Sequence, residues 1–413
     1  MVADSADPEP PLTQSASPVP GVELAAVAAG IRYPDRLDLV ALRFAPGTRA
    51  AAVFTRNAFC AAPVQVARDH LAACAFEPRA LLINTGNANA GTGAAGREAA
   101  EHCCTALAAA LDCESAAVLP FSTGVIGEDL PLAPIDAALP ALVAALDEDA
   151  WEAAATGILT TDTRPKFTTR RLKLDGVTCT LTGMAKGAGM LRPDMATMLA
   201  FVATDVPLSK ALLDSLLREA VDGSFHRISV DGDTSTNDAV LLASTAAAPI
   251  EQLDDPSDAR VAEFREALQS LFVELAQGLV RDGEGASRFV AIDVSGGRDA
   301  AECLDVAFTI AHSPLVKTAL FAGDPNWGRL LAAIGRAGLV DLDVAGVRIS
   351  INDVLIAEGG ARAASYSEDA GTAAMAPREL HLAVELGRGD AQETVWTSDF
   401  SYDYVRINAE YRS

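Results

Sequence analysis

Apolar residues recur along this chain at two spacings, one typical of helices and one typical of strands. The two kinds of segment alternate throughout, and no repeat of fixed period interrupts them. Helices are predicted at 97–111, 134–148, 151–157, 208–221, 258–281 and 300–312. Strands are predicted within 38–66, at the start of 80–90, at 169–184, 197–204 and 289–297, within 338–358, and near 380–387 and 393–400. The pattern predicts a layered α/β fold in which sheets pack between helices.

Composition limits the partners that this protein can have. Half of its 413 residues are hydrophobic, yet no apolar run approaches the roughly 20 residues that span a bilayer. The formal net charge of −24 should repel nucleic acid and anionic membrane surfaces, so neither is expected as a partner. A substrate carboxylate would need a local cation in so acidic a chain.

The cysteines and the first residues indicate a location. The seven cysteines show no C-x-x-C or zinc spacing, which indicates reduced, mostly buried thiols in a cytoplasmic protein. Residues 1–20 are rich in Pro, Ser and acids, and have neither the basic and apolar parts of a secretory signal nor the arginines of a transit peptide. They are predicted to form a disordered tail.

Two motifs resemble cofactor sites without meeting their requirements. Gly91 to Gly96 matches G-x-G-x-x-G, but a loop separates it from the preceding strand, and the acids that follow it lack a strand to present them. The acidic loop 231–238 lacks the Gly and Glu of a calcium loop, so it is either a hydrogen-bonded turn or part of an active-site wall. The five histidines are isolated, and no resident cofactor or metal is predicted.

Candidate nucleophiles are few. No G-x-S-x-G elbow is present, and the few, scattered histidines do not indicate a Ser-His-Asp triad. Residues 121–127 (FSTGVIG) place hydroxyls beside glycines after an apolar strand, which suits either a structural turn or oxyanion donors. Thr197 opens a buried strand. It is either a structural residue there or a nucleophile whose base is its own α-amine, and the second reading requires cleavage before Thr197.

Several segments together resemble the ornithine acetyltransferase family over nearly the whole chain after about residue 20. The central match is Lys186-Gly-Ala-Gly-Met190 followed by Pro193-Asp-Met-Ala-Thr197, which is similar to the family's self-cleavage motif. The other matching segments, in order, are Phe121-Ser-Thr-Gly124, Thr160-Thr-Asp-Thr163, Asp231-Gly-Asp-Thr-Ser-Thr-Asn-Asp238, Asp282-Gly-Glu-Gly285, Gly323-Asp-Pro-Asn-Trp-Gly-Arg329 and Tyr404-Val-Arg-Ile-Asn408-Ala-Glu-Tyr411. Each is weak alone, and the set in this order is specific.

The resemblance implies a precursor that cuts itself between Ala196 and Thr197. After the 1–20 tail, residues 21–196 would form an α chain and residues 197–413 a β chain, with a smaller strand-rich region at about 338–413. The implied fold is an αββα sandwich similar to that of N-terminal-nucleophile hydrolases, with different connectivity. Both fragments would stay together as an α2β2 heterotetramer.

The resemblance also implies an activity and its residues. Thr197 would be the nucleophile and Thr123 with Gly124 the oxyanion hole. The implied substrate contacts are Thr163, Lys186, Thr197, Glu284, Asn408 and Ser413, although the family often ends in Thr where this chain has Ser413. The family transfers acetyl from N-acetylornithine to glutamate in arginine biosynthesis, and some members also use acetyl-CoA as a co-substrate. An amidase or aminopeptidase on the same self-processing scaffold is the alternative.

Overall fold

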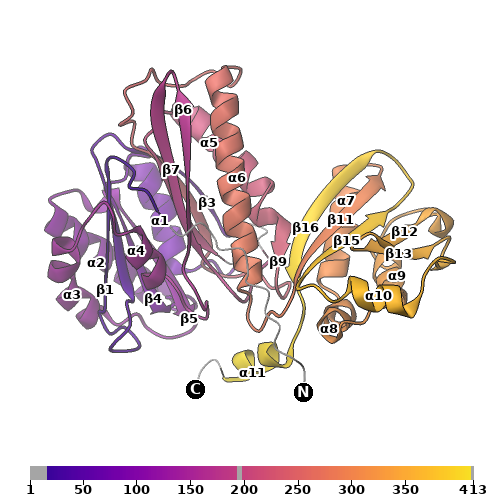
Figure 1. Ribbon diagram of the computed structural model, residues 1–413. Helices are drawn as coiled ribbons and strands as arrows, with labels where there is room; N and C mark the ends of the chain where they lie inside the picture. The colour runs from indigo at the N-terminus through magenta and orange to yellow at the C-terminus, as the bar shows by residue number, and fades with distance from the viewer. Residues whose placement is uncertain (1–15, 193–197, 411–413) are drawn as a thin grey trace.

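The first part of the fold consists of two sheets, as seen in a computed structural model that describes residues 16–192 and 198–410 (Figure 1). The four-stranded sheet has the order β1-β2-β4-β5, and only its β4–β5 pair is parallel. The five-stranded sheet has the order β3-β10-β8-β7-β6, and only its β10–β8 pair is parallel. Their bounds are β1 Val22–Val27, β2 Leu39–Phe44, β3 Arg49–Phe54, β4 Ala80–Asn87, β5 Val118–Val125, β6 Lys166–Leu174, β7 Val177–Lys186, β8 Leu199–Thr204 and β10 Ala239–Ser244.

The two sheets pack face to face through a shared apolar core. The rings of Phe121 in β5 and Phe201 in β8 meet edge to face, with centroids 5.0 Å apart, at the centre of this contact. Helix α1 (Ala62–Ala73) contacts β5 and β3, and α4 (Trp151–Gly157) contacts β1 and β6, so these helices add side chains to the core from opposite edges of the sheets.

Helices cover both outer faces. Helices α2 (Gly93–Leu111) and α3 (Leu132–Ala144) pack on the four-stranded sheet. Helices α5 (Lys210–Asp222) and α6 (Ala259–Arg281) pack on the five-stranded sheet (Figure 1). The layers therefore run helix, sheet, sheet, helix, and the predicted α/β fold with sheets packed between helices is confirmed.

A second body contains a seven-stranded sheet of order β14-β13-β12-β15-β11-β16-β9 and its own core (Figure 1). Its strands are β9 Ile228–Ser229, β11 Phe289–Gly297, β12 Arg348–Ile351, β13 Val354–Glu358, β14 Ala361–Arg362, β15 Glu379–Glu385 and β16 Ala391–Ser398. Its helices are α7 (Ala300–Ala311), α8 (Pro314–Ala322), α9 (Trp327–Gly335) and α10 (Glu368–Ala374), and the exposed α11 (Tyr402–Glu410) follows. Single turns of 3₁₀ helix lie at Ser115–Ala117, Phe225–Arg227 and Val344–Gly346.

Strand β9 lies in the chain between α5 and β10 of the first part of the fold, and a short polar network holds it against the second body, where it pairs with β16. The hydroxyl of Thr397 donates to the carbonyl oxygen of Ser229 over 2.7 Å. The buried ammonium of Lys317 donates to the Thr397 hydroxyl over 2.9 Å, and Nε2 of His312 lies 2.9 Å from the Ser229 hydroxyl. Because Ser229 lies two positions before the acidic loop 231–238, this junction fixes one end of that loop.

All seven cysteines are unpaired, and Cys103, Cys104, Cys179 and Cys303 are buried. Burial raises the pKa of the Cys103 thiol to about 12, so this thiol stays protonated near neutral pH. Within residues 16–192 and 198–410, no helix is both long enough and apolar enough to cross a membrane.

Candidate active site

A cavity of about 250 Å³ lies where strand ends and loops of both bodies converge. Thr123, Gly124, Lys186, Glu284 and Asn408, which the sequence predicts as site residues, all line it. They come from β5, the end of β7, the turn after α6, and α11. The remaining wall is formed by Ala88, Val125, Ile126, Thr160, Thr161, Ala188, Gly189, Met190, Ser235 and Asn237. Residues far apart in the sequence therefore meet around one cavity.

Three predicted residues, Ala196, Thr197 and Ser413, lie outside the described residues. The chain on both sides of the first gap is anchored near the cavity. Before the gap, Met190 lines the cavity, and the carbonyl oxygen of Leu191 accepts a hydrogen bond from Val230 N over 2.7 Å. After the gap, the carbonyl oxygen of Met198 accepts one from Ala239 N over 3.0 Å, at the start of the β8–β10 pair.

Backbone geometry permits only glycine at the second predicted oxyanion position. Gly124 has φ of +137°, and a Cβ there would lie 2.3 Å from the carbonyl carbon of Gly86 on neighbouring β4. Just before this pair, the Ser122 hydroxyl donates to Asn84 Oδ1 over 2.5 Å. The backbone of Thr123 and Gly124 is therefore held close to β4, with the cavity beside it.

Lys186 reaches the cavity from the end of the buried strand β7. Its ammonium donates to Thr160 Oγ1 over 2.7 Å and to Thr123 Oγ1 over 3.1 Å, and its side chain is 9% exposed. Burial lowers the pKa of Lys186 below its ordinary value, and the nearby Asp162 carboxylate opposes that effect. A cation therefore faces a small cavity in a protein of strongly negative net charge.

Lys186 belongs to a buried ionic cluster, which we call the Lys166 cluster and which consists of Asp162, Lys166, Lys186 and Asp282. Lys166 Nζ lies 2.6 Å from Asp162 Oδ1 and 2.5 Å from Asp282 Oδ2. Thr163, a predicted substrate contact, does not line the cavity. Its backbone N–H donates to Asp282 Oδ2 over 3.0 Å and its hydroxyl donates to Oδ1 of the same carboxylate.

A carboxylate, Glu284, also lines the cavity. Asn408 of α11 donates from Nδ2 to Glu284 Oε2 over 2.8 Å, which connects the last helix to the site. A Cβ at position 189 would lie 2.4 Å from the Glu284 carboxyl carbon, so Gly189 leaves the space that this carboxylate occupies. The cavity therefore presents both a cation and an anion to a bound molecule.

The acidic loop 231–238 is both a hydrogen-bonded turn and part of the cavity wall. The Asp231 carboxylate accepts hydrogen bonds from Met190 N over 2.6 Å and from Leu191 N over 2.8 Å. Ser235 and Asn237 line the cavity. Asp238 is buried, and burial raises the pKa of its carboxyl well above the ordinary value.

Sequence reasoning missed several polar residues of the site. It quoted Asp162, Asp282 and Asn237 inside family motifs without giving any of them an individual role, and it passed over Lys166. A signal for Lys166 was present, because the chain has only five lysines and this one opens strand β6, whose first three residues are buried. The partners of Asn237 come from distant segments, and no local pattern indicates them.

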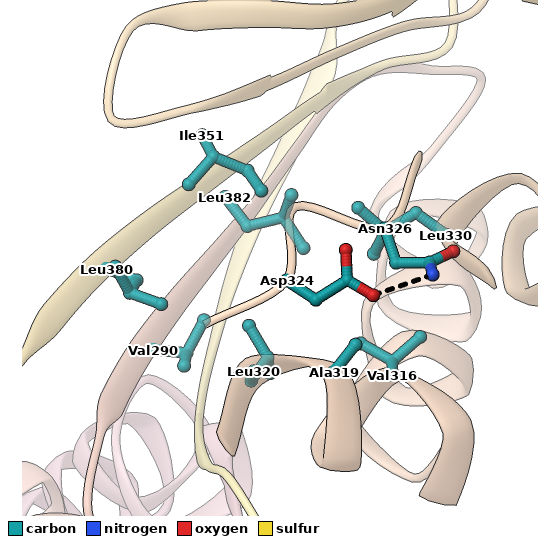
Figure 2. A pocket seen from close by; sticks show the side chains of 10 residues that line it. All are labelled: Val290, Val316, Ala319, Leu320, Asp324, Asn326, Leu330, Ile351, Leu380 and Leu382. Carbon is teal, nitrogen blue, oxygen red and sulfur yellow. Dashed lines mark hydrogen bonds between the residues drawn. The ribbon is translucent and has the colours of Figure 1, made fainter. Parts of the chain in front are cut away.

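A second cavity lies in the other body, beside the Gly323–Arg329 segment (Figure 2). Its volume is about 10 Å³, room for about one water molecule, and its lining is mostly apolar. Asn326, which lines it, donates to Asp324 over 2.9 Å and caps α9 by accepting from Arg329 N. This family-like segment therefore has a structural role in its own body.

The four layers and the first cavity define an α/β enzyme whose site offers hydroxyls, an ammonium and a carboxylate to one small molecule. The sequence model of the ArgJ family matches residues 23–413. The chain is 52% identical to the arginine biosynthesis bifunctional protein ArgJ of Pseudomonas syringae pv. tomato and 50% identical to that of Psychrobacter arcticus. Each alignment covers 96% of this chain and 97% of the relative. This protein belongs to the ArgJ family, and the resemblance inferred from its motifs is confirmed.

Two crystal structures are also similar to this chain. The arginine biosynthesis bifunctional protein argJ of Bacillus halodurans is 36% identical, with a TM-score of 0.49, over 51% of this chain and 98% of that one. The ornithine acetyltransferase of Mycobacterium tuberculosis, complexed with ornithine, is 35% identical, with a TM-score of 0.38, over 43% of this chain and 93% of that one.

Proposed function

We propose that this protein is a self-cleaving acetyltransferase of arginine biosynthesis, which moves acetyl from N2-acetyl-L-ornithine to L-glutamate through an ester on Thr197. The observation that carries the proposal is the meeting of Lys186 and Glu284 with Thr123 and Gly124 around one cavity. The names of the close relatives, which describe a bifunctional protein of arginine biosynthesis, support it.

Substrate recognition follows from the two charged side chains. Donor and acceptor both carry an α-carboxylate, and the Lys186 ammonium is the cation on the cavity wall that can bind it. Glu284 can bind the side-chain ammonium of ornithine. The same carboxylate repels the side chain of glutamate, so the acceptor must place that chain elsewhere in the cavity.

Acetyl transfer needs a nucleophile, a base and an oxyanion site. The Thr197 Oγ attacks the acetyl carbonyl while its own α-amine takes the proton. The Thr123 hydroxyl and the Gly124 N–H donate to the oxyanion. Because Lys186 already donates to Thr123 Oγ1, the Thr123 hydrogen is free to point at a developing negative charge.

The intermediate then collapses and the C–N bond breaks. Ornithine leaves with the proton held by the α-amine, and acetyl-Thr197 remains. The α-amine of glutamate attacks this ester, its proton passes to the base, and the C–O bond breaks to release N-acetylglutamate and restore Thr197. This is a ping-pong transfer with no free acetate.

Maturation uses the same Thr197 hydroxyl, at a stage when the Thr197 nitrogen is still part of the peptide bond and is not yet a base. Thr197 Oγ attacks the Ala196 carbonyl, the C–N bond breaks, and the hydroxyl proton passes to the released Thr197 nitrogen. Water then hydrolyses the resulting ester, which frees the Ala196 carboxylate and the Thr197 hydroxyl. The fragments 1–196 and 197–413 remain together as an α2β2 heterotetramer in the cytoplasm, a location that the unpaired cysteines support. Acetyl-CoA is a second acetyl donor to the same Thr197.

The test is a transfer assay with the purified protein, N-acetylornithine and glutamate, together with a denaturing gel. We expect N-acetylglutamate without free acetate, two fragments for the parent protein and one intact chain for Thr197→Ala. Release of acetate in place of transfer would instead identify an amidase. A Thr197→Ala protein that still divides at 196/197 would refute Thr197 as the cleaving nucleophile. Replacing N-acetylornithine by acetyl-CoA tests the second donor.

A further inference from the structure

The chain has only five lysines, and three of them, Lys166, Lys186 and Lys317, are buried. Lysines are rarely buried unless they are paired. Lys317 belongs to the junction of the two bodies, whereas Lys166 and Lys186 belong to the same ionic cluster. Of these two, Lys186 lines the cavity and Lys166 does not, so the mechanism gives Lys166 no direct contact with a substrate.

Each carboxylate of the Lys166 cluster holds a different part of the site. Asp162 accepts hydrogen bonds from Gly187 N over 2.8 Å and from Thr160 N over 3.1 Å. Gly187 follows Lys186 in the chain, and the Thr160 hydroxyl accepts from the Lys186 ammonium. Asp282 holds Thr163 and is followed two residues later by Glu284. Lys166 lies between the two carboxylates and joins them.

The charges of the cluster balance, since two carboxylates face two ammonium groups. The side chains of Lys166 and Asp162 are 0% exposed and that of Asp282 is 3% exposed. An isolated ion at that depth would cost several kcal/mol, so each charge depends on its partners. Lys186, 3.9 Å from Asp162 Oδ2, is the one member that also faces the cavity.

We propose that Asp162, Lys166 and Asp282 are positioning residues that fix the Lys186 ammonium at the cavity wall and set how firmly it keeps its proton. This proposal rests on the proposed function in one respect, namely that Lys186 binds the carboxylate of the substrate. Within the Lys166 cluster, the Asp162 carboxylate favours the charged form of Lys186. Lys166, a second cation close by, opposes that form. Asp162 stays ionised because the two lysines outweigh its burial and hold its pKa below the ordinary value.

Among the described residues, the charged or titratable groups that act on Lys186 include Asp162, Lys166, Asp238 and Glu284. They come from the turn before β6, from β6, from the loop before β10, and from the turn after α6. Asp162 pairs with Lys166 and lies 3.9 Å from Lys186, so it couples Lys186 to the rest of the cluster. Changing Asp162 or Lys166 should therefore alter Lys186 while Asp238 and Glu284 stay in place.

Two single variants should therefore act in opposite directions. Asp162→Asn removes an anion, and we expect the pKa of Lys186 to fall by about 1 pH unit or more. Lys166→Met removes a cation and replaces it with an uncharged side chain of similar shape. We expect the pKa of Lys186 to rise by a comparable amount. A loss of packing alone gives no reason for opposite signs.

The measurement is a pH titration of the lysine side-chain carbons by NMR, in full-length protein labelled at Cε of lysine. Five lysines give few signals, and Lys186→Met assigns the one of interest. Lys173→Met is the matched control, because Lys173 is exposed on the same strand as Lys166 and should leave the Lys186 titration unchanged.

Either single variant leaves a buried charge unbalanced, so folding needs its own check. The double variant Asp162→Asn/Lys166→Met removes one charge of each sign, and we expect it to fold and to restore the Lys186 titration towards that of the parent. Shifts of the same sign, or no shift, in the two single variants would overturn the proposal. If a single variant fails to fold, a double variant that also fails would overturn it.

The rate of acetyl transfer adds an independent readout. Because charged Lys186 binds the carboxylate, the alkaline limb of kcat/KM should move to lower pH in Asp162→Asn and to higher pH in Lys166→Met. A parent protein that transfers no acetyl refutes the proposed function. The NMR titration does not depend on activity, so it still decides whether the Lys166 cluster controls Lys186.

Discussion

Asn237 and Ser122 are joined by a hydrogen bond between the two sheets: Asn237 Nδ2 lies 2.9 Å from the Ser122 carbonyl oxygen. The same nitrogen donates to the carbonyl oxygen of Ala88 over 2.6 Å. Asn237 precedes β10 of one sheet, and Ser122 lies in β5 of the other, directly before Thr123. One buried amide therefore ties the acidic loop to the strand that carries the proposed oxyanion donors.

Asn237→Ala should lower kcat more than it raises KM. It leaves two carbonyl oxygens without this donor, which typically costs about 1–3 kcal/mol per buried group. A shift of β5 by a fraction of an ångström would misplace Thr123, so we expect kcat to fall about 10- to 100-fold. Steady-state kinetics and urea unfolding measure the two effects.

Asn57→Ala is the matched control for this change. Asn57 also donates from Nδ2 to a backbone oxygen, that of Thr234, but on the surface and over 3.2 Å. Its free energy of unfolding and its kcat should stay close to those of the parent. Equal losses in both variants would show that Asn237 has no special role in holding β5.

Thr123→Val tests the hydroxyl as an oxyanion donor while it preserves the shape of the side chain. Loss of one such donor typically costs about 10²–10³ in rate, so kcat should fall by that factor with little change in KM. Thr123→Ser keeps the hydroxyl and should keep most of the activity. If the Thr123→Ser and Thr123→Val variants lose activity equally, the Thr123 hydroxyl is not the oxyanion donor.

Elements with a strong apolar pattern could be predicted from the sequence. The helix predicted at 258–281 is α6, Ala259–Arg281, because its buried face repeats at helical spacing over its whole length. The strand predicted at 197–204 appears as β8, Leu199–Thr204, which is buried at every position. Local pattern sufficed for these elements since each buries apolar residues along most of its length.

The support of the site could not be predicted in the same way. Lys166 and Asp282 are 116 positions apart, and their ion pair exists only because the end of α6 passes the start of β6. Neither residue type nor spacing indicates such a contact. The contacts of Thr163 could not be predicted from its sequence motif either. Its motif indicated a substrate contact, whereas in the structure its hydrogen bonds go to Asp282.

Gly124→Ala should destabilise the fold as well as the site. Its added Cβ would lie 2.3 Å from the Gly86 carbonyl carbon, and backbone atoms cannot move aside as a flexible side chain can. Overpacking of this kind costs about 1–3 kcal/mol, and the positive φ adds about 1 kcal/mol. Urea unfolding should show a clearly lower midpoint.

Gly127→Ala separates the steric clash of an added Cβ from the conformational cost of a positive φ. Gly127 also has a positive φ, +85°, but nothing lies within 4 Å of the Cβ position, so only the conformational cost applies. We expect a loss of about 1 kcal/mol there. A Gly127 variant as unstable as the Gly124 variant would contradict the steric explanation.

His312 should make the junction between the two bodies sensitive to acid. Burial lowers the pKa of His312 to about 4, and the nearby cations Arg192, Lys317 and Arg336 add to this effect. In the unfolded chain the pKa is about 6.5. Below pH 6.5 the unfolded state therefore binds the proton first, and stability falls as pH drops from about 6.5 towards 4. The difference corresponds to about 3 kcal/mol at the acid end of this window.

His312→Gln removes the titrating ring and keeps groups that can bond to the Ser229 hydroxyl. We expect its free energy of unfolding to fall less than that of the parent between pH 6.5 and 4, while the two differ by a constant amount above pH 7. His102→Gln is the control, because His102 is exposed and lies on α2, away from the junction. Urea unfolding at several pH values measures the difference. If the parent and His312→Gln lose stability in parallel over this window, protonation of His312 is not what weakens the junction in acid.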